Sequence, residues 1–160
     1  MDYKVGIGYD IHRLAEGRKL FLGGIEIPYI KGLLGHSDGD ALIHALCDAI
    51  LGALNRGDIG EHFPDTDPNY QGISSTELLL KVKSILDDAG FQIINIDTII
   101  IAQEPKLSPF KLKIRQKLAE ILDLELDKIN IKAKTHEGLG ELGRKEAIAC
   151  WAIILIRRKE

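Results

Sequence analysis

The chain has 160 residues and a formal net charge of −3, with 45% hydrophobic and 28% charged residues. This length fits one domain, 1–160, with a core of its own. The acidic balance argues against non-specific nucleic-acid binding, which needs a basic surface. No apolar run approaches the roughly 20 residues of a membrane span, and the N-terminus lacks a signal-peptide pattern. We therefore expect a soluble cytoplasmic domain in which Cys47 and Cys150 are reduced core residues.

Hydrophobic periodicity divides the chain into strands and helices. In chain order we expect a strand at 3–10, a small β-hairpin at 21–28, helices at 37–54 and 74–89, a strand at 91–102, a helix at 105–122, and strands at 128–135 and 147–156. Ser37 is the expected N-cap of the first helix, and Ser74 with Glu77 forms a capping box at the second. The order predicts an α+β sandwich in which helices cover one face of a mixed four-stranded sheet.

The last strand differs from the others because residues 148–156 are apolar on both faces. A strand of that kind must be covered on both sides. In so small a chain the second cover could be another subunit, so the sequence predicts an oligomer that assembles through its sheets.

Asp10 and His12 lie two residues apart at a predicted strand end, so their side chains leave the same face. His44 lies in the first turns of an apolar helix, where a histidine needs a polar partner. Together they offer one oxygen and two nitrogens and leave a fourth position open, which is the pattern of catalytic zinc sites. The alternative is a solvated aspartate with two histidines that bond to backbone or carboxylate.

Two further segments carry polar groups suited to an anionic, hydroxylated ligand. The long connection 55–72 concentrates carboxylates around Phe63 and Pro64, which fits binding of a polyhydroxy substrate or of a second cation, or else a solvated acidic loop. Residues 132–140 place cations, a hydroxyl and Glu137 before a glycine-rich turn, with Arg144 beyond. Such an array can hold phosphate, with Glu137 on a hard cation.

Four motifs in these segments resemble the 2-C-methyl-D-erythritol 2,4-cyclodiphosphate synthase family. They are residues 8–12, 32–40, 57–67 and 129–133. The resemblance implies an enzyme of isoprenoid precursor synthesis by the non-mevalonate route. In its reaction the 2-phosphate of 4-diphosphocytidyl-2-C-methyl-D-erythritol 2-phosphate attacks the β-phosphate, and CMP leaves. It also implies a homotrimer in which neighbouring subunits share each site.

The resemblance assigns a role to each matching residue. Zn²⁺, or another divalent cation, would be held by Asp10, His12 and His44, and Mg²⁺ or Mn²⁺ with the diphosphate by Glu137. Catalytic stabilisation would come from His36 and Thr135. The erythritol and phosphate end would be bound by Ser37, Asp58, Ile59, Gly60, Phe63, Pro64, Asp65, Thr66 and Asp67. The cytidine pocket would be formed by Ala102, Pro105, Lys106, Leu107 and Ala133. Further substrate-binding positions would be Lys134, His136, Glu141 and Arg144.

Three of these positions depart from the family pattern. Lys134 and His136 stand where threonine or asparagine is common, and Glu141 stands where phenylalanine commonly lines a channel on the trimer axis. Two other functions remain open from the residues alone. One is a zinc-dependent phosphoesterase that uses an activated water. The other is a non-catalytic trimeric metal-binding module.

Overall fold

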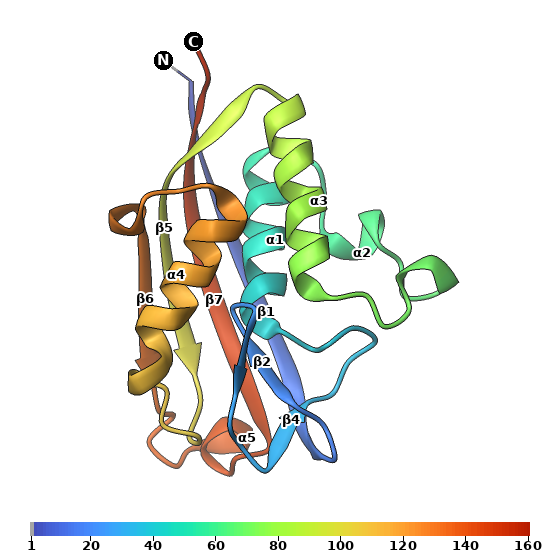
Figure 1. Cartoon of the computed structure of the whole chain (residues 1–160), viewed down its shortest axis with the longest axis vertical. Coiled ribbons are helices and arrows are strands. Elements are labelled where there is room, and N and C mark those ends of the chain that lie inside the picture. Colours follow the sequence, from blue (N-terminus) through green and yellow to red (C-terminus); the bar gives the residue numbers. More distant parts are fainter. Residues whose placement is uncertain (1) are drawn as a thin grey trace.

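The computed structural model describes residues 2–160 and consists of a mixed sheet, a separate hairpin and a layer of helices (Figure 1). In chain order its elements are β1 (Tyr3–Glu16), β2 (Leu20–Leu22), β3 (Ile25–Ile27), β4 (Lys31–Leu33), α1 (Ala41–Ala53), α2 (Ile59–His62), η1 (Pro68–Tyr70), α3 (Ser75–Asp88), β5 (Phe91–Ile101), η2 (Ser108–Phe110), α4 (Lys111–Leu122), η3 (Leu126–Lys128), β6 (Ile129–Lys134), α5 (Gly140–Gly143) and β7 (Ala147–Arg158). The η elements are 3₁₀ turns.

The sheet has five strands in the order β4-β1-β7-β5-β6, so the expectation of four strands is wrong. Strand β1 continues beyond Asp10 to Glu16, and its added end pairs with β4, Leu14 opposite Leu33. The pairing of β5 with β6 is parallel, and the other pairings are antiparallel. The predicted hairpin is confirmed as β2 and β3. Polar side chains at Asp10 and His12 interrupt the apolar alternation of β1, which explains why periodicity ended the strand too early.

Helix α1 packs directly on β1 and β7, and α3 and α4 complete the layer on the same face (Figure 1). Two glycines of β1 permit this close approach. A Cβ atom at Gly6 would lie 1.8 Å from the carbonyl oxygen of Ala49, and one at Gly8 would lie 1.8 Å from that of Ala45. Neither distance is possible without displacing the helix. The two glycines therefore fix α1 against the strand that carries Asp10 and His12.

Two helix starts differ from the sequence prediction. Asp40, not Ser37, is the N-cap of α1, and its carboxylate accepts hydrogen bonds from Ile43 N at 3.1 Å, Gly23 N at 2.9 Å and Gly24 N at 2.7 Å. This buried carboxylate joins the β2–β3 turn to the helix. Helix α4 begins at Lys111 instead of 105, and the 3₁₀ turn η2, which contains a proline at 109, precedes it. Ser74 is confirmed as the N-cap of α3.

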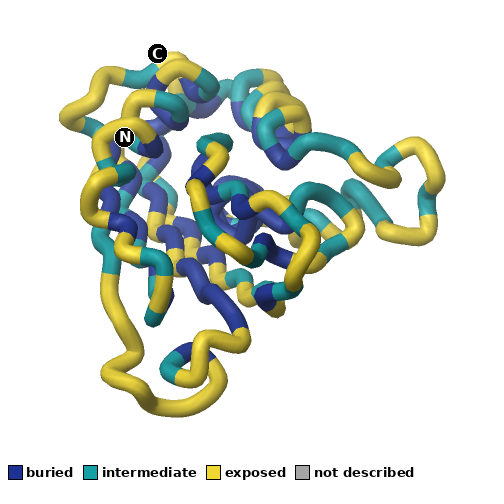
Figure 2. The backbone as a smooth tube through the Cα atoms, turned by 60° about the horizontal axis from the view of Figure 1, so that its bottom comes forward, coloured by how far each residue is buried: buried dark blue, intermediate teal, exposed yellow. Residues whose placement is uncertain are grey.

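The face of the sheet opposite the helices is apolar and exposed. On β7, Ile148, Cys150 and Ile154 are fully buried under the helices, while the alternate residues face outward; this alternation of burial can be followed along the strands in Figure 2. Tyr9 and Trp151 pack on that outer face with ring centroids 4.6 Å apart. Its exposed large side chains are Tyr3, Val5, Ile7, Tyr9, Ile11, Trp151 and Ile153. The prediction of a last strand that is apolar on both faces is thus confirmed.

Both cysteines, Cys47 and Cys150, are free and buried, as expected. Among residues 2–160, no helix is long and apolar enough to cross a membrane.

Candidate active site

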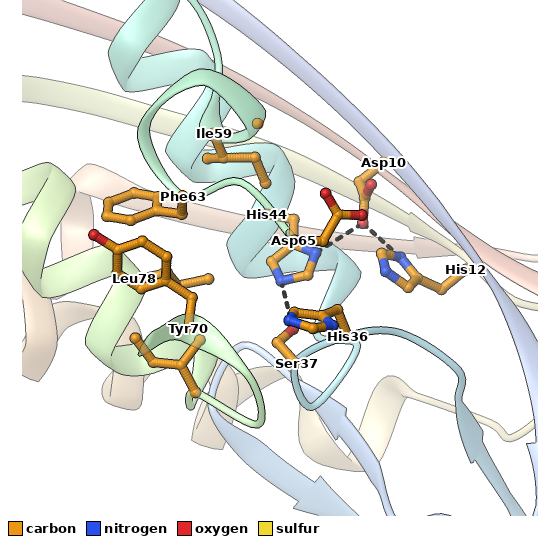
Figure 3. Close-up of a pocket in the computed structure, with 12 residues that line it drawn as sticks. Asp10, His12, His36, Ser37, His44, Ile59, Phe63, Asp65, Tyr70 and Leu78 are labelled. Atoms are coloured by element: carbon orange, nitrogen blue, oxygen red, sulfur yellow. Dashed lines mark hydrogen bonds and ion pairs between the residues drawn. The ribbon is translucent and has the colours of Figure 1, made fainter. Parts of the chain in front are cut away.

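Asp10, His12 and His44 converge on one point between β1 and α1 (Figure 3). The Oδ2 atom of Asp10 lies 2.7 Å from Nδ1 of His12 and 3.3 Å from Nδ1 of His44. One donor atom from each residue lies within 4.8 Å of the other two. The structure therefore brings together, from β1 and α1, the three residues that the sequence predicted as metal ligands.

The contact between Asp10 and His12 is unusual because both atoms are buried and neither makes a well-formed hydrogen bond. Asp10 Oδ2 and His12 Nδ1 have no partner of acceptable geometry, although they lie 2.7 Å apart. Buried polar atoms are normally paired, so two converging orphans mark a place for a cation. A donor set of one carboxylate oxygen and two imidazole nitrogens fits Zn²⁺ best.

Charge within the cluster supports this fit. Burial raises the pKa of Asp10, but the contacts with His12 and His44 lower it by more, so its pKa lies below the usual value. Burial lowers the pKa of His44, but the contact with Asp10 raises it by more, so its pKa lies above the usual value. The carboxylate is therefore ionised near neutral pH, as a ligand must be. A metal ion bound here would compete with protonation of His44, so its binding would be weaker at low pH.

A cavity of about 250 Å³ opens beside the cluster (Figure 3). The predicted residues that line it are Asp10, His12, His36, Ser37, His44, Ile59, Gly60, Phe63 and Asp65, and sequence reasoning missed Tyr70, Ile73 and Leu78. Tyr70 meets Phe63 edge to face at 5.3 Å between centroids. Tyr70 could have been predicted from the sequence, because it is an aromatic residue in a long polar connection. The cavity thus has imidazole and carboxylate groups at one end and an apolar wall at the other.

The long connection 55–72 is ordered by its own carboxylates. Asp58 caps α2 by accepting from Glu61 N at 3.0 Å, and Asp67 caps η1 by accepting from Asn69 N at 2.9 Å. Asp48 of α1 accepts from Ile59 N at 2.8 Å and so ties the connection to the helix below. Asp58, Pro64, Thr66 and Asp67 do not line the cavity in this chain.

A second cavity, of about 350 Å³, lies where β5 and β6 end. It contains the predicted residues Ala102, Pro105, Lys106, Leu107, Ala133, Lys134 and Thr135, together with Gln103, Glu104 and Ser108, which were missed. No residue lines both cavities. Within one chain, then, the structure does not bring His36 and Thr135 to a common pocket.

The turn after β6 carries the remaining predicted residues and is exposed. The Oε1 atom of Gln103 accepts from His136 N at 3.3 Å and from Gly138 N at 3.1 Å. Glu137 has a left-handed backbone, with φ of 52°, and its N–H donates to Thr135 Oγ1 at 3.3 Å. His136 Nδ1 lies 2.6 Å from the carbonyl oxygen of Leu139, so its ring is directed at the turn.

Glu141 and Arg144 lie apart from both cavities. Arg144 pairs with Glu146 at 2.8 Å, and this contact raises the pKa of Arg144 and lowers that of Glu146. Glu141 lines a smaller cavity with Arg13 and Ala147. Arg144 thus pairs with the carboxylate of Glu146 and not with that of Glu141.

Comparisons with known proteins agree over nearly the whole chain. The profile of the YgbB family matches residues 3–157. A 2-C-methyl-D-erythritol 2,4-cyclodiphosphate synthase of Caldicellulosiruptor bescii is 54% identical over 154 residues, which are 96% of this chain and 98% of that protein. The bifunctional IspDF of Campylobacter jejuni superposes with a TM-score of 0.95 at 43% identity over 99% of this chain, which spans 43% of that protein. A CDP-bound 2C-methyl-D-erythritol-2,4-cyclodiphosphate synthase superposes with a TM-score of 0.90 at 38% identity, covering 96% of this chain and 100% of that one.

Proposed function

The chain belongs to the YgbB family, and we propose on that premise that it catalyses the reaction for which its relatives are named. It is a lyase of the non-mevalonate route. It converts 4-diphosphocytidyl-2-C-methyl-D-erythritol 2-phosphate to 2-C-methyl-D-erythritol 2,4-cyclodiphosphate and CMP. An oxygen of the 2-phosphate forms a bond to the β-phosphorus, and the bond from that phosphorus to the CMP oxygen breaks with its electron pair. No water enters, and no protein nucleophile is needed.

Catalysis of this step requires positioning and neutralisation of charge, since two anionic groups must meet. The observation that carries the proposal is the convergence of Asp10, His12 and His44 at the mouth of the first cavity. A divalent cation held there, Zn²⁺ by its donor set, would bind a substrate phosphate and withdraw negative charge. His36 and Ser37 line the same cavity and can donate hydrogen bonds to phosphate oxygens.

The second cavity is proposed to bind the cytidine end. Its Ala102, Leu107 and Ala133 present backbone and small apolar groups to a base, while Lys106 and Lys134 add cations for the diphosphate. Glu137, exposed on the turn after β6, would hold Mg²⁺ or Mn²⁺ with the diphosphate.

A homotrimer would join the two cavities across subunits. The exposed outer face of the sheet provides a large apolar surface, since Val5 is 67% exposed and Ile7 is 60% exposed. Exposed apolar patches of this kind mark interfaces. Packing of sheets from three chains would cover this face and set the first cavity of one subunit against the second cavity of its neighbour.

The reaction is tested by incubating the purified protein with the diphosphocytidyl substrate and Mg²⁺ and following phosphorus NMR. The expected products are the cyclic diphosphate and CMP. A linear phosphate that contains solvent oxygen would show a phosphoesterase instead. A zinc-loaded protein that releases no CMP with any divalent cation would show a binding module.

Sharing of the site between subunits is tested by mixing two inactive variants. His44→Ala removes a ligand in the first cavity, and Thr135→Ala removes a hydroxyl in the second. Random reassembly of the two variants in equal amounts should restore about a quarter of wild-type activity, since that share of interfaces joins two intact halves. A site contained in one chain would give no recovery.

A further inference from the structure

A chain of hydrogen bonds lies behind His44, on the side of the ring away from Asp10. The Nε2 atom of His44 is 3.0 Å from Oγ of Ser75, the first residue of α3. That Oγ in turn contacts Oδ1 of Asp38 at short range, and the N–H of Ser75 donates to Oδ2 of Asp38 at 3.0 Å. Both donors of Ser75 are therefore directed at one carboxylate. Ser37 Oγ lies 3.1 Å from the same Nε2 atom.

The direction of these hydrogen bonds follows from which groups can donate. An ionised carboxylate only accepts, so the Ser75 hydroxyl gives its proton to Asp38. The Ser75 oxygen then has only lone pairs left for His44, and Nε2 must carry the proton of that contact. The neutral ring is thereby fixed with its other nitrogen, Nδ1, unprotonated. Nδ1 is the atom that faces Asp10.

Because Ser75 and His44 are buried, water cannot easily take over their hydrogen bonds. Ser75 is 0% exposed and His44 is 6% exposed, so water has little access to either side chain. Asp38 is half-buried and also accepts from Asp40 N at 3.1 Å, which holds it in the turn before α1. The N-terminal end of α3 further favours a carboxylate at this position. The three residues come from three segments, so the ring is held by tertiary structure.

We infer that Ser75 and Asp38 are positioning residues that fix the tautomer and the orientation of His44 for metal binding. The inference rests on the proposed function, because it assumes a divalent cation at Asp10, His12 and His44. Groups that accept a hydrogen bond from a ligating histidine commonly raise metal affinity by 10–100-fold. Here a serine hydroxyl stands between the histidine and the carboxylate, and neither residue lines the substrate cavity.

The test measures zinc affinity of the whole protein by competition with a chromophoric chelator. Ser75→Ala should weaken zinc binding by about 10–100-fold. Ser75→Thr keeps the hydroxyl and should recover most of that loss. Asp38→Asn keeps the shape but removes the charge and should weaken binding by a smaller factor. The matched control is Ser74→Ala, which removes the adjacent hydroxyl and the cap of α3 but has no contact with His44. It should lower the unfolding midpoint and leave zinc affinity unchanged.

Two results would overturn the inference while leaving the metal site intact. One is wild-type zinc affinity in both Ser75→Ala and Asp38→Asn. The other is an equal loss in Ser74→Ala and Ser75→Ala, which would show that only the start of α3 matters. Failure of the proposed metal site itself has a different signature: the wild-type protein would bind zinc no better than His44→Ala.

Discussion

The two groups of polar residues in this chain are built in opposite ways. The cluster of Asp10, His12 and His44 is enclosed between a strand and a helix that glycines bring into direct contact. The turn from Thr135 to Glu137 is exposed on all its residues and is held largely by one side-chain oxygen, that of Gln103. The contacts within a single chain are sufficient to hold Asp10, His12 and His44 together without a ligand. The second group has few contacts of its own, which is expected of a surface that a neighbouring subunit and a substrate complete.

The largest effect is expected from removing a member of the enclosed cluster. His44→Ala and His12→Ala should each abolish stoichiometric zinc and lower turnover by more than the roughly 100-fold that loss of an outer partner costs. The fold should persist, because the remaining packing of α1 is unchanged. Metal analysis with circular dichroism checks both points. His62→Ala is the control for zinc content, since His62 contacts the carbonyl oxygen of Arg56 and the ring of Phe63 and is not part of the cluster. Full zinc content in His44→Ala would refute the ligand assignment.

The second largest effect is expected from changing Gly8, which allows α1 to pack closely on β1 around the cluster. Gly8→Ala would put a Cβ atom 1.8 Å from the carbonyl oxygen of Ala45, so the helix must move away. We expect a loss of about 1–3 kcal/mol or more in the free energy of unfolding, and weaker zinc binding because His44 moves with the helix. Urea unfolding and chelator competition measure these. In Gly52→Ala the new methyl group has only one neighbour, 3.9 Å away, so stability should hold or rise. Equal stability of Gly8→Ala and Gly52→Ala would contradict the close packing.

A smaller effect is expected at the exposed turn. Gln103→Leu removes the acceptor for two backbone N–H groups, each hydrogen bond being worth about 0.5–1.5 kcal/mol. The turn then samples other conformations, and kcat/KM should fall by about tenfold while zinc content stays at the wild-type level. Gln116→Leu, an exposed change of the same kind on α4, serves as the control. If Gln103→Leu lost zinc instead, the two groups would not be independent.

The sequence predicted the enclosed cluster better than the turn, for physical reasons. Asp10 and His12 lie two residues apart on one strand, so their common face is a local property, and His44 is recognisable as a polar residue in an otherwise apolar helix. Gln103 was missed because its role depends on β5 and β6 ending side by side, which no local pattern reveals. Ser75 was missed for the same reason, since its partners Asp38 and His44 lie far away in the chain.

Errors in the fold have a similar origin. The strand that the sequence analysis missed is β4, which has only three residues and is defined by its pairing with β1. Asp40 is the cap of α1 because its carboxylate also binds the β2–β3 turn, whereas Ser37 satisfied the local rule equally well. Local propensity located the helices and long strands, and tertiary hydrogen bonds decided their ends.

The smallest effect concerns Asp97 on β5, which pairs with residues of β6, the strand that leads to the turn. Partial burial raises the pKa of Asp97 on β5, but hydrogen bonds from Lys132 and Asn130 on β6 lower it by more, so its pKa lies below the usual value. The ionised form is therefore favoured in the folded protein, and its stabilisation is present above the unfolded pKa of about 4. It is lost as the pH falls through the lower folded value.

Asp97→Asn should remove this stabilisation, which an exposed pair limits to about 1 kcal/mol or less. The difference in free energy of unfolding between wild type and variant should be present at neutral pH and vanish in acid, as measured by urea unfolding. Asp88→Asn is the control, because Asp88 is exposed and has no ion pair among residues 2–160. A difference that grew in acid would contradict the depressed pKa. Because Asp97 lies on the strands and not in the enclosed cluster, zinc affinity should be the same in both variants at every pH.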